Sequence, residues 1–174
     1  MVPKDWKKPK PTPGQRAKAE SDAKKVIARN KKARHEYHIE DKYEAGISLT
    51  GTEVKALRAG RASLSEAWVE IDGGEVWLQR ANIPEYAQGT WTNHAPTRKR
   101  KLLLHKGQIL SLQMKVAAKG YTIVPLELYF IGGRAKVEIA LARGKQEWDK
   151  RQALREKQDQ REALRAMRDF ARRS

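Results

Sequence analysis

Two histidines flank a carboxylate and a tyrosine in the run His35-Glu36-Tyr37-His38. An imidazole beside a carboxylate can act as an acid–base pair, or bind a metal ion, when the side chains converge. The alternating apolar residues from His35 to Leu49 predict a strand, and residues three apart on a strand face opposite sides. A third ligand at a fixed spacing is also missing, so the sequence argues against a catalytic or metal site here.

Other catalytic signatures are missing as well. The chain has no cysteine, which excludes a thiolate zinc site, a cysteine nucleophile and a disulfide framework. The sequence has no Ser-His-Asp order, no paired-carboxylate signature and no glycine-rich phosphate loop, because Gly73-Gly74 and Gly132-Gly133 are typical of hairpin turns. We therefore expect a protein that is not an enzyme and that needs no cofactor or metal.

Two clusters of cations suit phosphate binding. Arg98, Lys99, Arg100 and Lys101 are consecutive and precede Leu102-Leu103-Leu104. We expect the leucines to pack, which would hold the cations against a rigid element. The second cluster runs from residue 30 to residue 35, next to Tyr37. Cations combined with aromatic residues favour RNA recognition by phosphate contact and base stacking.

Overall charge supports the same class of partner. The 174 residues include 37 Lys and Arg against 21 Asp and Glu, a net charge of +16. Such an excess favours a polyanion, with nucleic acid ahead of an anionic membrane. No apolar run approaches the roughly 20 residues of a membrane span, and the Lys/Pro-rich start does not resemble a secretory signal. The lack of cysteine fits a reducing cytosol, so we expect a cytoplasmic protein.

Charge and proline distribution divide the chain into three parts. Residues 1–28 form a predicted disordered basic arm, which holds four of the seven prolines. Residues 29–143 hold most of the apolar residues and form the predicted folded domain. Residues 144–174 are rich in helix formers and cations but poor in large apolar residues, so we expect a tail that is partly disordered when free and helical when a partner holds it.

The pattern of residues 29–143 predicts a small antiparallel barrel. Residues 67–72 and 76–78 alternate around Asp72-Gly73-Gly74, and residues 122–130 alternate before a return strand at 137–141, which predicts two hairpins. Thr50 and Glu53 match a capping box for a short helix ending near Gly60, and residues 108–116 predict a second. Five or six strands with two to three short helices indicate a mainly β, OB-like barrel.

Several long segments resemble one known family. They are NKKARHEYHIEDKYEAGISLTGTEVKALRAGRASL from Asn30, HAPTRKRKLLLHK from His94, KGYTIVPLELYF from Lys119 and VEIALARGKQEWDKRQALREK from Val137. In this order they resemble the bacterial SsrA-binding protein (small protein B) family, from about residue 30 to residue 157. The resemblance implies an OB-like barrel that binds the tRNA-like domain of transfer-messenger RNA (tmRNA). It also implies delivery of that RNA to stalled ribosomes for trans-translation, together with elongation factor Tu, by a monomer.

The resemblance also implies which residues act. The RNA-facing positions match Asn30, Arg34, His35, Tyr37, Glu44, Arg98, Arg100, Lys101 and Leu103, while Lys55 and Arg58 on the predicted helix are added as candidate contacts. The ribosome-binding tail, which enters the empty mRNA channel and the decoding centre, matches Gly144, Lys145, Trp148, Asp149, Lys150, Arg151 and Met167. Gln146 and Trp148 stand where relatives often carry Lys and His. Trp148 keeps a stacking face but loses a titratable ring.

Two alternatives remain open at this stage. A general ribosome- or tRNA-associated RNA-binding protein would share the fold and the charge without the tmRNA partner. A basic ribonuclease would use His35, His38 and Glu44, where imidazoles and carboxylates are dense. Competition between tmRNA and bulk tRNA would separate the first alternative, and an RNA cleavage assay would separate the second.

Overall fold

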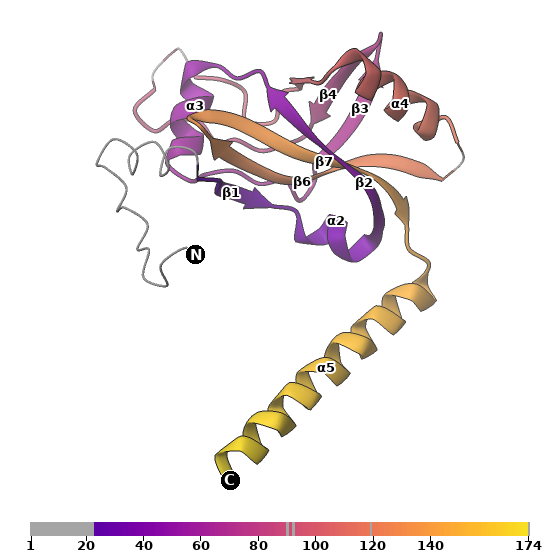
Figure 1. Cartoon of the computed structure of the whole chain (residues 1–174). Helices are drawn as coiled ribbons and strands as arrows, with labels where there is room; N and C mark the ends of the chain where they lie inside the picture. Colours follow the sequence, from indigo (N-terminus) through magenta and orange to yellow (C-terminus); the bar gives the residue numbers. More distant parts are fainter. Residues whose placement is uncertain (1–22, 90, 92, 119, 174) are drawn as a thin grey trace, which may run out of the picture.

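The computed structural model describes residues 23–89, 91, 93–118 and 120–173. Its core is a ring of antiparallel strands in the order β6-β3-β4-β5-β2-β7, closed by the pairing of β6 with β7, and β1 is added alongside β6. The strands are β1 Lys25–Arg29, β2 Tyr37–Ile47, β3 Trp68–Asp72, β4 Glu75–Gln79, β5 Arg100–Leu103, β6 Tyr121–Ile131 and β7 Arg134–Gly144. The predicted barrel is confirmed, with seven strands in place of five or six (Figure 1).

Three short helices accompany the barrel, and a long one follows it. They are α2 Lys31–Glu36, α3 Gly51–Arg58, α4 Lys106–Val116 and α5 Glu147–Arg173. Helices α3 and α4 and the two hairpins were expected from the sequence. Helix α2 was not, because the predicted strand from His35 begins only at Tyr37. His35 and Glu36 therefore end a helix, and the argument that placed both histidines on one strand was wrong.

The arm predicted over residues 1–28 begins to fold before its expected end. Strand β1 starts at Lys25 and pairs with β6, where Arg29 lies opposite Glu127. Residues 25–28 therefore belong to the sheet, although the prediction placed them in the arm. Residues 1–22 lie outside the described residues, so the rest of the predicted arm stays a prediction.

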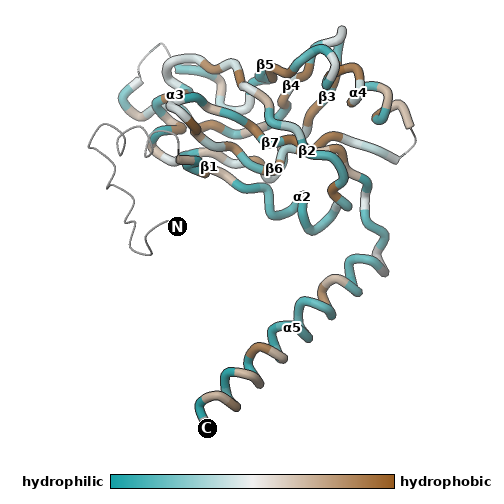
Figure 2. Tube along the Cα trace, viewed as in Figure 1, coloured by the Kyte–Doolittle hydropathy of each residue, from teal (hydrophilic) through white to brown (hydrophobic). Residues whose placement is uncertain are grey.

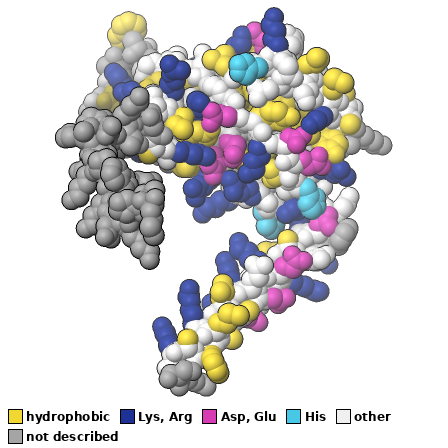
Figure 3. Space-filling view, viewed as in Figure 1, with side chains coloured by type: hydrophobic (Ala, Val, Ile, Leu, Met, Phe, Trp, Pro, Cys, Tyr) yellow, Lys and Arg dark blue, Asp and Glu magenta, His cyan; other side chains and the backbone are white. Residues whose placement is uncertain are grey.

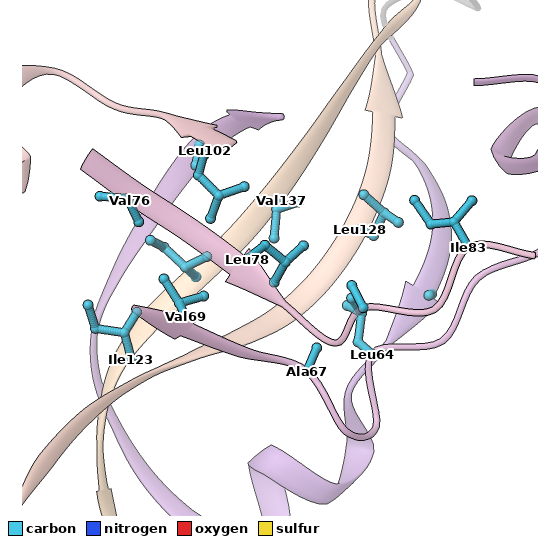
Figure 4. Packing of buried hydrophobic residues seen from close by; sticks show 14 of the residues in the cluster. Leu64, Ala67, Val69, Val76, Leu78, Ile83, Leu102, Ile123, Leu128 and Val137 are labelled. Atoms are coloured by element: carbon cyan, nitrogen blue, oxygen red, sulfur yellow. The ribbon is translucent and has the colours of Figure 1, made fainter. Parts of the chain in front are cut away.

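The main core fills the barrel (Figure 4). Leu78, Leu102 and Leu128 are at most 1% exposed, and they pack with buried residues of β3, β4, β6 and β7. A second, smaller cluster lies against α2 and contains Ala33, Val124, Leu126, Ala140 and Ala142. Burial of apolar side chains on both faces of β6 and β7 explains why these strands are rich in Val, Ile, Leu and Ala.

Bulges divide strands between the two cores. The alternation of Val124, Leu126 and Leu128 predicted one common face, but the register of β6 against β7 shifts between Pro125 and Glu127. Val124 and Leu126 consequently face the small cluster, whereas Leu128 faces the main core. A bulge inserts an extra residue and reverses the facing of the later residues in the strand. The sequence pattern alone does not reveal it.

Helix α5 extends away from the barrel as a single rod (Figures 1 and 2). Every described side chain from Arg151 to Arg172 is exposed, and none joins either core. Its length exceeds the roughly 12–15 residues below which isolated helices are marginal. Side-chain hydrogen bonds from Gln152 to Glu156 and from Gln158 to Glu162, at 3.2 and 3.1 Å, add local support. Disorder of the tail in the free chain stays a prediction.

Candidate nucleic-acid interface

Asn30 builds the first of the predicted RNA-facing elements. Its side-chain oxygen accepts the Ala33 amide proton at 2.9 Å and caps α2, while its Nδ2 donates to the Leu64 carbonyl at 3.0 Å. The residue is 3% exposed. The Asn30 side chain is therefore buried and hydrogen-bonded within the protein, which does not fit the RNA contact predicted for it. It positions α2, whose Arg34 and His35 are exposed.

Replacing Asn30 with Ala should lower the free energy of unfolding by about 1–3 kcal/mol, because it removes a helix cap and leaves the buried Leu64 carbonyl without its donor. Urea unfolding followed by circular dichroism measures this change. Asn30→Ser keeps an uncharged side-chain oxygen that can cap α2, so it should cost less than Asn30→Ala. Equal stability of the wild type and Asn30→Ala would contradict the capping role.

A basic cleft lies between α2 and the N-terminal part of α5. Its described lining residues include Lys31, Arg34, His35, Lys145 and Lys157, with Ala153 and Leu154 completing the wall and no acidic residue among them. Two contacts connect the start of α5 and the residues just before it to α2 and β2. The Lys145 amide donates to the Glu36 carbonyl at 2.8 Å, and His38 Nε2 lies 3.3 Å from Asp149 Oδ2. Arg34, His35 and Lys145, predicted separately for barrel and tail, are thus brought together.

The suggested ribonuclease centre does not assemble. His38 and Glu44 stand six residues apart on β2, which corresponds to about 20 Å of strand. Glu44 instead accepts hydrogen bonds from the Tyr129 hydroxyl and from Lys136 Nζ. Those hydrogen bonds lower the pKa of Glu44. Within the described part of the chain, no group of three or more His, Asp or Glu is placed to hold a metal ion.

A buried carboxylate organises the cation run. Glu53 on α3 is completely buried, and it accepts hydrogen bonds from Arg98 Nη2 at 2.6 Å and from Arg100 Nε at 2.8 Å. It also accepts the Thr50 amide proton at 2.7 Å, as the predicted capping box requires. Burial alone would raise the pKa of Glu53, but these hydrogen bonds and the Arg100 charge lower it to about 2.

Arg100 is a structural residue and not the RNA contact that was predicted. Its side chain has no exposed surface, and its guanidinium also donates to the carbonyls of Ala81, Pro96 and Arg98. These hydrogen bonds use four of the five N–H donors of Arg100, and the buried guanidinium has no surface to offer to RNA. Arg98 differs, because its side chain is 33% exposed and one face remains open to solvent.

Lys101 and Leu103 alternate with the buried residues of β5 and are more exposed. Leu102 is 1% exposed and packs in the core, but Leu103 is 55% exposed. The expectation that all three leucines pack is therefore wrong for Leu103. Leu103 and Glu44 line one hollow together with Lys136, so two residues that the resemblance implied for RNA contact lie side by side. Lys101 is half-buried and paired with Glu75.

Helix α3 presents the remaining barrel candidates. Lys55 and Arg58 are exposed, as predicted, while Leu57 is buried in the core. Lys55 Nζ lies 5.5 Å from the centre of the Tyr86 ring. Tyr37 is half-buried and lines a hollow with Trp68, which is 43% exposed. Cations and aromatic side chains therefore adjoin at two places, Lys55 beside Tyr86 and Lys32 in the hollow with Tyr37 and Trp68. This is the combination that RNA stacking and phosphate contact require.

The far half of α5 is amphipathic. Leu164, Met167 and Phe170 are exposed at 57%, 69% and 76%, and their spacing puts them on one face of the helix. Arg161, Arg165, Arg168 and Arg172 follow a second face at helical spacing. Gly144 ends β7 and leads into α5, which contains Asp149, Lys150 and Arg151. The stacking role predicted for the Trp148 side chain lies outside the described part of the chain.

No helix in the described part of the chain combines the length and apolar character needed to cross a membrane. A closed antiparallel barrel with exposed cations and aromatic residues, continued by a cationic helix, has the features of a small OB-like nucleic-acid-binding protein. The chain belongs to the SmpB protein family, whose model matches residues 27–169.

Close relatives share nearly the whole chain. An SsrA-binding protein of Bifidobacterium longum (strain DJO10A) is 73% identical over 145 residues, which cover 83% of this chain and 92% of the relative. One from Streptomyces avermitilis is 61% identical over 166 residues, covering 95% of this chain and 93% of the relative. A solved structure described as "tmRNA-SmpB: a journey to the center of the bacterial ribosome" is 47% identical, with a TM-score of 0.59, covering 73% of this chain and 93% of its own.

Proposed function

We propose that this protein binds the tRNA-like domain of tmRNA through its barrel and delivers that RNA to stalled ribosomes for trans-translation. The observation that carries the proposal is the 73% identity to an SsrA-binding protein across almost the whole folded domain. The similarity to a chain from a tmRNA-SmpB ribosome structure points the same way. The protein acts by binding and presentation, and its residues perform no chemistry.

On the barrel, we assign RNA contact to exposed and half-exposed side chains. Arg34, Lys55, Arg58, Arg98 and Lys101 supply charge, and His35 and Tyr37 add rings that can stack on bases. A carboxylate would repel phosphate, so Glu44 fits a different contact, accepting hydrogen bonds from base edges or 2′-hydroxyls. Leu103 shapes the hollow beside Glu44. Asn30 and Arg100 support these residues from within.

The tail is assigned to the ribosome. Its cations, including Lys145, Lys150 and Arg151, can neutralise ribosomal RNA phosphates along the empty mRNA channel and at the decoding centre, while Met167 supplies an apolar contact. The exposure of every described side chain from Arg151 to Arg172 supports this assignment, because it leaves this part of α5 available to a partner. Gly144 is the last residue of β7 and precedes the short segment that leads into α5.

The same proposal places the protein in the cytoplasm, where ribosomes work, as a monomer. Elongation factor Tu is the expected companion in the delivery complex, because a tRNA-like RNA is its natural cargo.

Binding to the isolated tRNA-like domain should be tight at low salt and should fall by roughly 10³-fold between 50 and 200 mM salt if about six phosphates are neutralised. Fluorescence anisotropy across a salt series measures the slope. Bulk tRNA should compete poorly at every salt concentration. Equal competition by bulk tRNA would favour a general tRNA-binding protein, and cleavage of the labelled RNA would favour a ribonuclease.

A further inference from the structure

One buried acid gathers three cations beside α2. Glu127 on β6 is 8% exposed, and its carboxylate lies 2.8 Å from Lys24 Nζ, 3.3 Å from Arg29 Nε and 3.0 Å from Arg34 Nη2. Three separate parts of the chain supply these cations, namely the residue before β1, β1 itself and α2. We call Lys24, Arg29, Arg34 and Glu127 the Glu127 cluster.

The fold explains why these groups converge. Arg29 lies opposite Glu127 in the pairing of β1 with β6. The chain then turns into α2, and the Asn30 amide donates to the Leu126 carbonyl at 2.8 Å. The bulge in β6 between Pro125 and Glu127 occurs at the same point. Because of this bulge, the Glu127 side chain does not follow the regular alternation of side chains between the two faces of the strand.

Each of the three cations contacts Glu127 and is also partly exposed to solvent. The side chains of Lys24, Arg29 and Arg34 are 40%, 61% and 47% exposed, whereas that of Glu127 is 10% exposed. Lys24 Nζ also lies 4.1 Å from the centre of the Tyr129 ring, which fixes its position further. Lys and Arg side chains gather at this place on the surface, between β1 and α2 (Figure 3). One carboxylate cannot neutralise three cations, so the cluster keeps a net positive charge that faces solvent.

We infer that the Glu127 cluster is a binding site for the RNA phosphate backbone, with Lys24 and Arg29 as contacts and Glu127 as the residue that positions them. The inference rests on the proposed function and extends it to residues that neither the motifs nor the resemblance indicated. Flexible cations lose conformational freedom when they bind RNA, and side chains already ordered by a buried carboxylate lose less. The hydrogen bond from Lys24 lowers the pKa of Glu127, although burial opposes this, so the carboxylate is ionised at neutral pH.

The test uses a substitution whose effect on net charge alone would raise RNA affinity, whereas the inference predicts that affinity falls. Glu127→Gln keeps the shape of the side chain and makes the protein more positive by one charge, which by itself would strengthen RNA binding. We expect affinity for the tRNA-like domain to fall about tenfold instead, because three cations lose their common anchor. The matched control is Glu138→Gln, on the neighbouring strand opposite Glu127. Within the described residues Glu138 forms no ion pair, so this variant should bind RNA equally or slightly more tightly.

A second pair of variants tests the contacts themselves. Arg29→Ala should reduce the slope of log affinity against log salt by about 0.7–0.9, the value for one lost phosphate contact. Arg165→Ala removes the same charge from the exposed tail and should leave the slope unchanged. Urea unfolding of each variant ensures that the chain is folded where binding is measured.

Unchanged or tighter RNA binding by Glu127→Gln, or an unchanged salt slope for Arg29→Ala, would overturn the inference. The wild-type chain in the same assay reports separately on the proposed function. If the wild type prefers tmRNA over bulk tRNA and only these variants fail to respond, the function stands and the Glu127 cluster is structural.

Discussion

A chain that ends at Lys145 should still bind the tRNA-like domain of tmRNA with an affinity within about twofold of the full chain, yet it should lose at least about 100-fold of its ability to support peptide tagging on stalled ribosomes. The expected size follows from avidity, since joining two binding modules strengthens the whole by about 10²–10⁴-fold. Gel-shift titration and a reconstituted tagging assay measure the two properties.

This truncation leaves the folded barrel domain intact. It removes α5 but leaves β7 complete, and no described side chain of α5 belongs to either hydrophobic core. The Lys145 amide can still donate to the Glu36 carbonyl. The free energy of unfolding of the barrel should therefore stay within about 0.5 kcal/mol of the wild-type value, as for surface changes that touch no core contact.

A point substitution separates the charge of the tail from its helical form. Ala163→Pro keeps the net charge but places proline inside α5, which costs about 3 kcal/mol of helix stability. Tagging should fall, whereas the control Ala163→Ser should tag nearly as well as the wild type.

If the chain truncated after Lys145 lost its affinity for RNA, or if it still supported tagging, the proposed division of function between barrel and tail would be wrong.

The strands were largely predictable because their signals are local. Alternation around Gly73-Gly74 and Gly132-Gly133 identified both hairpins, and Thr50 with Glu53 marked the start of α3. Helix α2 was not predicted because it is only six residues long, and its formation depends on the Asn30 cap and on Ala33 packing against β6 and β7. Such a helix owes its stability to tertiary contacts and not to its own sequence.

The cation run shows where the prediction of site residues failed and what signal was available. Four consecutive cations look equivalent in sequence, but Arg100 begins a strand on which buried and more exposed residues alternate. Period-two counting back from the buried Leu102 would have placed Arg100 inside and Lys101 outside. The partner of Arg100 is 47 residues away in Glu53, and the Glu127 cluster spans a still longer separation. No local pattern indicates such pairs.

Replacing Glu53 with Ala should destabilise the protein by about 3–5 kcal/mol, the cost of removing one partner from a buried ion pair. Arg100 would then remain buried with its charge uncompensated, and Arg98 would lose the two hydrogen bonds that hold it. Chemical denaturation at neutral pH measures the loss. RNA affinity should also fall, since Arg98 is an assigned contact whose position depends on Glu53.

Acid should reproduce part of this loss in the wild type. The pKa of Glu53 is about 2 in the folded chain against an ordinary value of 4.5, so the unfolded chain binds the proton first as the pH falls. The stabilisation is complete above pH 4.5 and disappears as the pH falls towards 2. It amounts to about 3 kcal/mol, from 1.36 kcal/mol for each pH unit.

Glu53→Gln provides the matched variant for this titration, because it keeps the size and one acceptor but cannot ionise. Its free energy of unfolding should lie below that of the wild type at pH 6, and the difference should shrink by most of that 3 kcal/mol as the pH approaches 2. A constant difference across this range would mean that Glu53 does not titrate with the fold. In that case its pairing with Arg100 would contribute packing and hydrogen bonds but no linkage to protons.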